Sequence, residues 1–258
     1  MEFKKSPNGD RLEFTEQRLT LDLPPEGWLT LEKVRQELNP VSVFVFGSRA
    51  RNDHKPNSDV EIGIFFDNPS CFSHAELQKI IQPPENIKVY SYKIDDFSKC
   101  KLIIPFQREL FIYEVITTGV TILGVQILEK MKPPTITLHH LASSLKFWLG
   151  RASDSMVCLT HGASEIANTL FSKSCLAGTR DLIIYRKGFF PKSLNQIVEE
   201  SNSLDLGEYS SLPNLGILAR KKLIVNPEIA LKNIYFLNKF IESSILEELE
   251  KEEYRKIL

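Results

Sequence analysis

The sequence has little cysteine, no long apolar run and no excess of charge of either sign. Its 258 residues include four cysteines, and no two of them form a C-x-x-C pair, which argues against a disulfide framework and favours a reducing cytoplasm. The longest apolar stretches have the length of a strand, whereas a membrane span requires about 20 apolar residues. The first residues lack an apolar run after their charges, so no secretory signal is expected. These absences predict a cytoplasmic protein that has no membrane partner.

The balance of charge and composition describes an ordinary globular chain. There are 32 Lys and Arg against 33 Asp and Glu, which gives a formal net charge of −1. Because nucleic-acid binding depends on unbalanced cationic charge, this balance argues against extended contacts with DNA or RNA. Hydrophobic residues make up 42% of the chain, and the length allows one large domain or two small ones.

Patterning along the chain predicts an α+β protein with three segments. Residues 1–27 are expected to form an N-terminal extension, with a hairpin turn at Asn8-Gly9. Residues 28–132 alternate between strand and helix signals, which predicts a mixed β-sheet with flanking helices. Pro133-Pro134 marks the boundary, and residues 133–258 show helical periodicity and predict an α-helical bundle domain.

The individual elements follow from periodicity and turn residues. Thr30 is predicted to be the N-cap of the first helix, although the capping box is incomplete. Strands are predicted at residues 41–46, 59–66, 87–92 and 120–123. Helices are predicted at residues 31–38, 73–81, 106–117, 138–156, 166–185, 191–201 and 227–250.

Two carboxylates occupy the start of the second predicted strand. Asp59 and Glu61 are two residues apart, so in a strand they project from the same side. Neighbouring carboxylates repel each other unless a cation lies between them. Since oxygen ligands suit Mg²⁺ or Mn²⁺, the pair predicts a divalent-metal site.

The end of the preceding strand supplies groups suited to a triphosphate. Gly47 lets the backbone approach a ligand closely, and the Ser48 hydroxyl with nearby N–H groups can hold phosphate oxygens. Arg49 and Arg51 could add charge-assisted contacts to the phosphates, although a solvated loop explains each of them equally well. Together with the carboxylate pair, these residues predict a site for a metal–nucleoside triphosphate.

The pattern Gly47-Ser48-Arg49-Ala50-Arg51, followed by Ser58-Asp59-Val60-Glu61, resembles the signature of the nucleotidyltransferase superfamily related to DNA polymerase β. It is similar to the minimal nucleotidyltransferases and to the kanamycin nucleotidyltransferase type. The resemblance implies that Gly47 and Ser48 grip the triphosphate and that Asp59 and Glu61 bind the metals. It also implies an in-line attack by an acceptor hydroxyl on the α-phosphorus, with release of pyrophosphate.

The chain departs from the superfamily pattern at the third carboxylate. The resemblance implies a further carboxylate on the next strand, where this sequence has Tyr90. Three explanations remain open: the carboxylate is displaced, one metal site is weak, or the protein binds nucleotides without fast turnover. The resemblance also implies a general base from the helical domain, as in aminoglycoside-modifying relatives, and in the first long helix of that segment Asp154 is the only acidic residue.

The leading hypothesis is therefore an Mg²⁺- or Mn²⁺-dependent nucleotidyltransferase that moves a nucleoside monophosphate, with AMP from ATP favoured, to a hydroxyl. The acceptor is expected to be a small molecule or a protein, bound with the nucleotide between the two domains. The alternative is a catalytically degenerate nucleotide-binding protein with a regulatory or toxin–antitoxin role. The sequence leaves a homodimer open.

Overall fold

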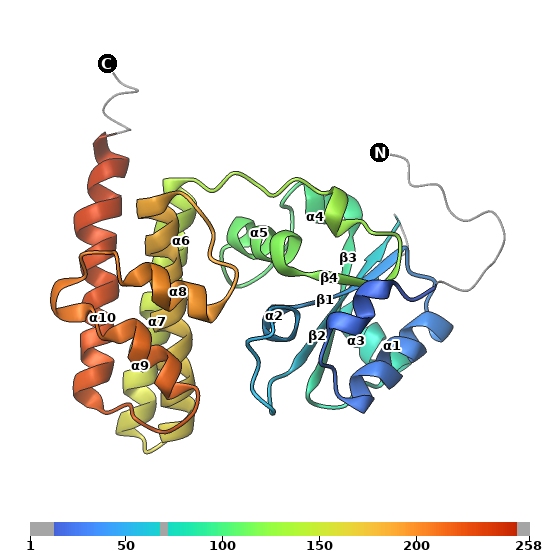
Figure 1. Ribbon diagram of the computed structural model, residues 1–258, viewed down its shortest axis with the longest axis horizontal. Coiled ribbons are helices and arrows are strands. Elements are labelled where there is room, and N and C mark those ends of the chain that lie inside the picture. Colours follow the sequence, from blue (N-terminus) through green and yellow to red (C-terminus); the bar gives the residue numbers. More distant parts are fainter. Residues whose placement is uncertain (1–12, 68–71, 252–258) are drawn as a thin grey trace. The chain divides into compact units, whose positions relative to one another are not determined.

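The structure is a computed structural model that describes residues 13–67 and 72–251 (Figure 1). The chain divides into two compact units. The first comprises Met1–Ile103 and Phe111–Pro134, and the second comprises Ile104–Leu110 and Thr135–Leu258. The hairpin predicted around Asn8-Gly9 lies outside the described residues.

A four-stranded mixed sheet forms the centre of the first unit. The strands are β1 (Ser42–Phe46), β2 (Val60–Phe66), β3 (Ile87–Lys93) and β4 (Val120–Gly124). Their order is β3-β2-β1-β4, with β1 antiparallel to both β2 and β4, and β2 parallel to β3. The four predicted strands are confirmed, because runs of β-branched and aromatic residues fit a buried sheet.

Short helices surround this sheet. They are η1 (Glu16–Thr20), α1 (Pro25–Glu37), α2 (Gly47–Ala50), α3 (His74–Ile81), α4 (Ile94–Ser98), α5 (Arg108–Thr118) and η2 (Leu128–Lys130). The prediction that Thr30 caps the first helix is wrong. The helix begins six residues earlier than predicted, at Pro25, because proline suits the first helical position, where its missing N–H needs no partner. The Thr30 hydroxyl instead donates to the carbonyl of Glu26 at 2.8 Å.

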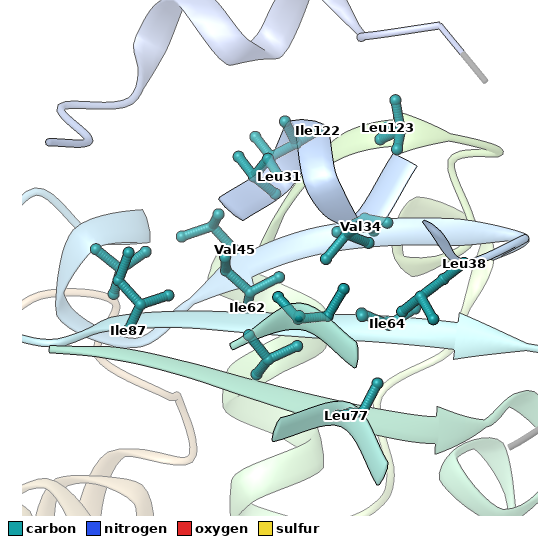
Figure 2. Packing of buried hydrophobic residues seen from close by; sticks show 14 of the residues in the cluster. Leu31, Val34, Leu38, Val45, Ile62, Ile64, Leu77, Ile87, Ile122 and Leu123 are labelled. Carbon is teal, nitrogen blue, oxygen red and sulfur yellow. The ribbon is translucent and has the colours of Figure 1, made fainter. Parts of the chain in front are cut away.

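One face of the sheet carries the aliphatic core (Figure 2). Leu31 and Val34 of α1 and Leu77 of α3 are fully buried against it. On β2 the side chains that join this aliphatic core are the even-numbered Val60, Ile62, Ile64 and Phe66. Each such burial stabilises the fold by about 1.5–3 kcal/mol. Because side chains alternate along a strand, this packing places Glu61 on the opposite face.

The opposite face of the sheet is aromatic. The Phe44 ring lies across β2, where an added Cβ on Gly63 would be only 2.2 Å from it. The Phe65 ring packs at a tilt against Phe44, with a centroid distance of 4.8 Å, and edge-to-face against Phe97, at 5.1 Å. The residue at position 63 must therefore be glycine for these rings to pack. This face changes from polar at Glu61 to aromatic at Phe65.

The second unit is helical, as the sequence predicts. Its helices are α6 (Leu138–Thr160), α7 (Ser164–Lys187), α8 (Leu194–Ser201), η3 (Gly207–Tyr209), α9 (Leu212–Ala219) and α10 (Pro227–Phe240), followed by a π-helical segment, Ile241–Leu246. The sequence did not reveal α9, which is short and has little periodicity. Among the described helices, none is both long and apolar enough to cross a membrane.

Polar side chains inside the second unit hold its helices together. The Asn168 amide donates to the carbonyls of Ala219 and Lys222, and its oxygen accepts from the N–H groups of Ile224 and Val225. All four hydrogen-bonding positions of this amide are thus satisfied by the last residue of α9 and by the segment that joins α9 to α10. A buried amide with this many partners fixes the path of that segment.

Candidate nucleotide site

Glu61 and Gly47 meet at the junction of β1, β2 and α2. Glu61 pairs with Phe46 across the antiparallel strands, so Gly47 follows directly at the end of β1. Gly47 has a φ of +72°, and a Cβ added there would lie 1.8 Å from Oε2 of Glu61. The Glu61 carboxylate thus occupies the space that any other side chain at position 47 would fill. This contact explains why position 47, which faces Glu61 of β2, is a glycine.

Asp59 and Tyr90 lie close to the same carboxylate. Asp59 is exposed and directly precedes β2, two residues before Glu61. On β3, Tyr90 pairs with Gly63, which places it on the Glu61 face. Burial raises the pKa of the Tyr90 phenol, and the negative charges of Glu61 and Asp59 raise this pKa further. The phenol is therefore within electrostatic reach of both carboxylates.

The donors at this position fit a hard divalent cation. Carboxylate oxygens are the ligands that Mg²⁺ and Mn²⁺ prefer, and Mg²⁺ commonly uses one or two carboxylates together with water and substrate phosphates. Within the described part of the chain, no three His, Cys, Asp or Glu side chains are grouped as a metal site. On β3, the position where the resemblance implies a third carboxylate holds Tyr90, whose ring is stacked on the His74 ring at a centroid distance of 6.3 Å.

Arg49 has a structural role inside the first unit. Its side chain is buried, and its terminal nitrogens donate to the carbonyls of Asp22 at 2.9 Å and of Pro56 and Ser58 at 3.2 Å. These bonds hold the loop between α2 and β2 against the segment that precedes α1. The placement differs from the phosphate contact that the sequence suggested, because both terminal nitrogens are already engaged by backbone.

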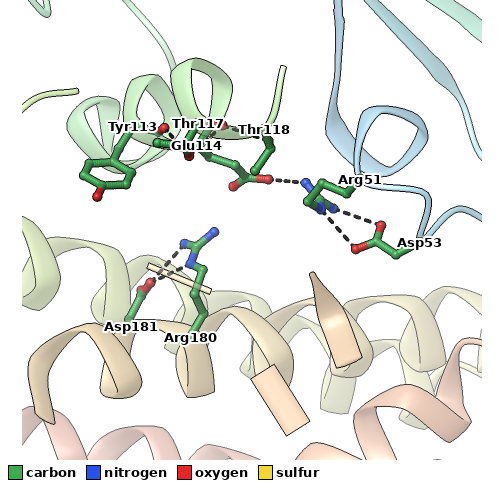
Figure 3. Close-up of polar contacts among 8 residues, drawn as sticks. All are labelled: Arg51, Asp53, Tyr113, Glu114, Thr117, Thr118, Arg180 and Asp181. Carbon is green, nitrogen blue, oxygen red and sulfur yellow. Dashed lines mark hydrogen bonds and ion pairs between the residues drawn. The ribbon is translucent and has the colours of Figure 1, made fainter. Parts of the chain in front are cut away.

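Arg51 is held by two acidic residues (Figure 3). Its Nε and Nη2 donate to the two oxygens of Asp53 at 3.0 and 3.3 Å, and its Nη1 donates to Oε1 of Glu114 on α5. Burial opposes the charge on Arg51, but the carboxylates of Glu114 and Asp53, and more weakly Glu61, outweigh it and raise its pKa. The guanidinium therefore remains a cation within a small acidic cluster.

Ser48 presents its hydroxyl beside these groups. The Ser48 side chain is partly exposed, and within the described residues no hydrogen bond to its hydroxyl is found. Its backbone carbonyl accepts a bond from the N–H of Asp53 at 3.0 Å, which ties the start of α2 to the following loop. The hydroxyl remains able to donate to a phosphate oxygen.

The sequence did not point to Glu114 or Asp53. Glu114 is 63 residues from Arg51, and no local spacing connects them. Asp53 is only two residues from Arg51, but a charged pair in a polar loop is usually solvated. In both cases the partial burial of the three side chains, which are 11–23% exposed, is a tertiary property that a motif search does not show.

The second unit contains a buried acid that the sequence did not single out. Asp181 on α7 is fully buried, accepts from the Ser144 hydroxyl at 2.5 Å, and is paired with Arg180 at 2.9 Å (Figure 3). Asp154, the acid considered as a general base, instead pairs on the surface with Arg151 at 3.1 Å. The buried carboxylate of this unit is therefore Asp181 on α7, whereas Asp154 on α6 lies at the surface.

Comparison with known proteins agrees with the fold of the first unit. Residues 30–117 match the family model of the nucleotidyltransferase domain. Together with the mixed sheet, this match supports the assignment of these residues to the nucleotidyltransferase superfamily. No curated protein matches the chain.

Among solved structures, the chain resembles spectinomycin adenyltransferase AAD(9) from Enterococcus faecialis, determined with ATP and spectinomycin. The likeness has a TM-score of 0.53 at 15% sequence identity, and it covers 82% of this chain and 98% of the adenyltransferase. It extends the agreement in fold beyond the sheet to the helical part of the chain.

Proposed function

We propose that this protein is an Mg²⁺- or Mn²⁺-dependent nucleotidyltransferase that transfers a nucleoside monophosphate to an acceptor hydroxyl and releases pyrophosphate. The observation that carries the proposal is the Glu61 carboxylate held against Gly47, with both Glu61 and Asp59 acting electrostatically on the same Tyr90 phenol. A metal-binding carboxylate next to a glycine turn is what a phosphate-transfer site requires, since the turn lets the triphosphate approach the metal.

In this proposal, each residue at the site has a separate role. Asp59 and Glu61 would hold the cation, and the Ser48 hydroxyl would donate to a phosphate oxygen. The glycine at position 47 leaves room for Glu61 and for the ligand's phosphates. When bound there, the cation would neutralise charge on the transferred phosphoryl group and on the leaving pyrophosphate. Arg49 supports the loop rather than the nucleotide, because its two terminal nitrogens donate to three backbone carbonyls.

The proposed nucleotide is ATP, and the proposed acceptor is a small molecule in preference to a protein. Support for both comes from the adenyltransferase whose fold this chain resembles, which was determined with ATP and the small molecule spectinomycin. The balanced net charge of −1 gives no support for a long nucleic-acid acceptor.

The test is transfer of label from each of the four α-labelled nucleoside triphosphates in the presence of Mg²⁺ or Mn²⁺. Acceptors are tested as small-molecule and protein fractions, and released pyrophosphate is measured separately. Asp59→Asn and Glu61→Gln should each lower transfer at least about 100-fold, as expected for removal of a metal ligand. The matched control is Asp95→Asn, which removes an exposed carboxylate that pairs with Lys99 on the surface and should leave transfer unchanged.

The second candidate function, a nucleotide-binding regulatory protein, is favoured by one observation. The Tyr90 phenol, rather than another carboxylate, lies beside Glu61 and Asp59. This candidate predicts metal-dependent nucleotide binding that is lost in Glu61→Gln, with no pyrophosphate released from any of the four nucleotides. Released pyrophosphate that depends on Asp59 would exclude it.

A further inference from the structure

One end of the second unit exposes large aliphatic side chains. Val157 lies in the last turn of α6 and Ile166 in the first turn of α7. Leu218 lies in the last turn of α9, and Leu223 lies in the link that joins α9 to α10, residues 220–226. Their exposed fractions are 55%, 57%, 40% and 59% in that order. We call these four residues the apolar end. Because burial of such side chains is favourable, the apolar end indicates an interaction surface.

Buried hydrogen bonds bring the four segments to the same end of the unit (Figure 1). The Ser155 hydroxyl of α6 donates to the carbonyl of Ala167 on α7 at 2.7 Å, which aligns the last turn of α6 with the first turn of α7. The Asn168 amide of α7 donates to the carbonyls of Ala219 and Lys222. These bonds hold the end of α9 and the link beside the same turn of α7. Segments that are distant in the sequence therefore expose their aliphatic side chains together.

Leu223 is held in a fixed position although it is exposed. The carbonyl of the preceding Lys222 accepts from the Asn168 amide at 3.0 Å, and the N–H of the following Ile224 donates to the amide oxygen at 3.2 Å. Because both neighbours of Leu223 are bonded to one buried side chain, the link has little conformational freedom at this point. A partner that binds Leu223 need not order the link first, and preorganisation of this kind strengthens binding.

Charged side chains of both signs flank the apolar end. Lys221 and Lys222 lie in the link, Glu165 lies in the first turn of α7, and Glu228 lies in the first turn of α10. All four are exposed, and within the part of the chain that the structure describes none of them forms an ion pair. The neighbouring Arg220 is half-buried and has interactions of its own. The four unpaired charges are therefore two positive and two negative.

We propose that the apolar end is the interface of a homodimer, in which it packs against the same surface of a second copy of this chain. In a two-fold symmetric interface a surface meets its own copy, so it must complement itself. A surface with unpaired charges of both signs can do so, because the lysines of each copy can face the glutamates of the other. A strongly acidic or strongly basic partner would instead place like charge against half of these residues. The inference does not depend on the proposed catalytic activity.

The first experiment measures the mass of the full-length chain by sedimentation equilibrium at about 1–100 μM, where the wild type should form a dimer. Leu223→Asp should raise the Kd of the dimer at least about 30-fold, because it places a charge in an apolar interface. The matched control is Leu29→Asp, which changes an exposed leucine on α1 of the first unit and should leave this Kd unchanged. Circular dichroism checks that both variants are folded.

The second experiment uses charge reversal to identify the partner as a second copy. Lys221→Glu/Lys222→Glu and Glu165→Lys/Glu228→Lys should each dimerise at least about tenfold more weakly than the wild type, since like charges then face each other. When the two variants are mixed, a heterodimer should form with nearly the affinity of the wild type, because opposite charges face each other again. Native mass spectrometry separates the heterodimer from both homodimers. Recovery of the dimer on mixing cannot result from misfolding.

The contrary outcomes are distinct. A wild-type chain that remains monomeric at about 100 μM would overturn the inference and leave the apolar end to a partner of another kind. A dimer that tolerates Leu223→Asp, or a mixture of the charge-reversed variants without preference for the heterodimer, would mean that the interface lies elsewhere. None of these results bears on the proposed nucleotidyltransferase function, which is tested separately by transfer of label.

Discussion

Replacement of Gly47 by alanine is the sharpest perturbation of the candidate site. The backbone at position 47 has a φ of +72°, a conformation that costs a residue with a Cβ about 1–2 kcal/mol. The new Cβ would also lie 1.8 Å from Oε2 and 2.9 Å from Cδ of Glu61. Because non-bonded carbon contacts are optimal at about 3.5–4.0 Å, the carboxylate must move by more than about 1 Å.

Two effects on measurable quantities follow from this displacement. The free energy of unfolding should fall by about 1–3 kcal/mol, from backbone strain and repacking together. Label transfer should fall by about 100-fold, since a misplacement of about 1 Å in a catalytic group has roughly that effect. Urea unfolding followed by circular dichroism measures the first quantity, and pyrophosphate release measures the second.

A matched glycine separates strain from displacement. Gly162 has a nearly identical φ of +74°, but a Cβ there would meet no atom within 4 Å. Gly162→Ala should therefore show the backbone cost alone, with transfer unchanged. If Gly47→Ala were no more destabilising than Gly162→Ala and kept full transfer, the claim that Gly47 positions the Glu61 carboxylate would be refuted.

Three further predictions concern stability. Arg49→Ala should lower the free energy of unfolding by about 3 kcal/mol, because three backbone carbonyls lose a charged donor; a change below about 1 kcal/mol in urea unfolding would contradict this role. Asp181→Ala should lower it by about 3–5 kcal/mol, because it removes a fully buried carboxylate that binds Arg180 and Ser144. Asp154→Ala, at an exposed pair, should lower it by less than about 1 kcal/mol, and equal losses would show that burial does not matter. Burial raises the pKa of the Cys175 thiol to about 12, so the native thiol should resist iodoacetamide at about pH 9. Since this thiol ionises more readily when unfolded, its contribution to stability should be complete below about pH 8.5 and decline as pH rises toward 12; rapid native labelling in peptide maps would count against the burial.

Local sequence patterns were sufficient for most elements of the fold. The strand β2 could be predicted because Val60, Ile62 and Ile64 alternate with other residues, and the same alternation predicts that Glu61 points away from that core. The start of α1 could not be predicted from Thr30, because Pro24 and Pro25 are compatible both with a loop and with the first turn of a helix. Short helices such as α9 contain too few turns to show a period.

By itself, the sequence determined which residue types stand at the candidate site. The spacing of Gly47, Ser48, Asp59 and Glu61 is a local property, and the alternation of strand side chains turns it into a prediction about one face of a sheet. The family match over residues 30–117 agrees with that prediction of class.

Only the tertiary structure decided what the two arginines contact. Arg49 and Arg51 are equally plausible phosphate ligands in the sequence, but the first is bound by carbonyls and the second by Asp53 and Glu114. Glu114 lies 63 residues away from Arg51, and the two meet because the sheet and α5 pack together within the first unit. The charge that an arginine offers to a ligand depends on such partners, and distant partners become neighbours only when the chain folds.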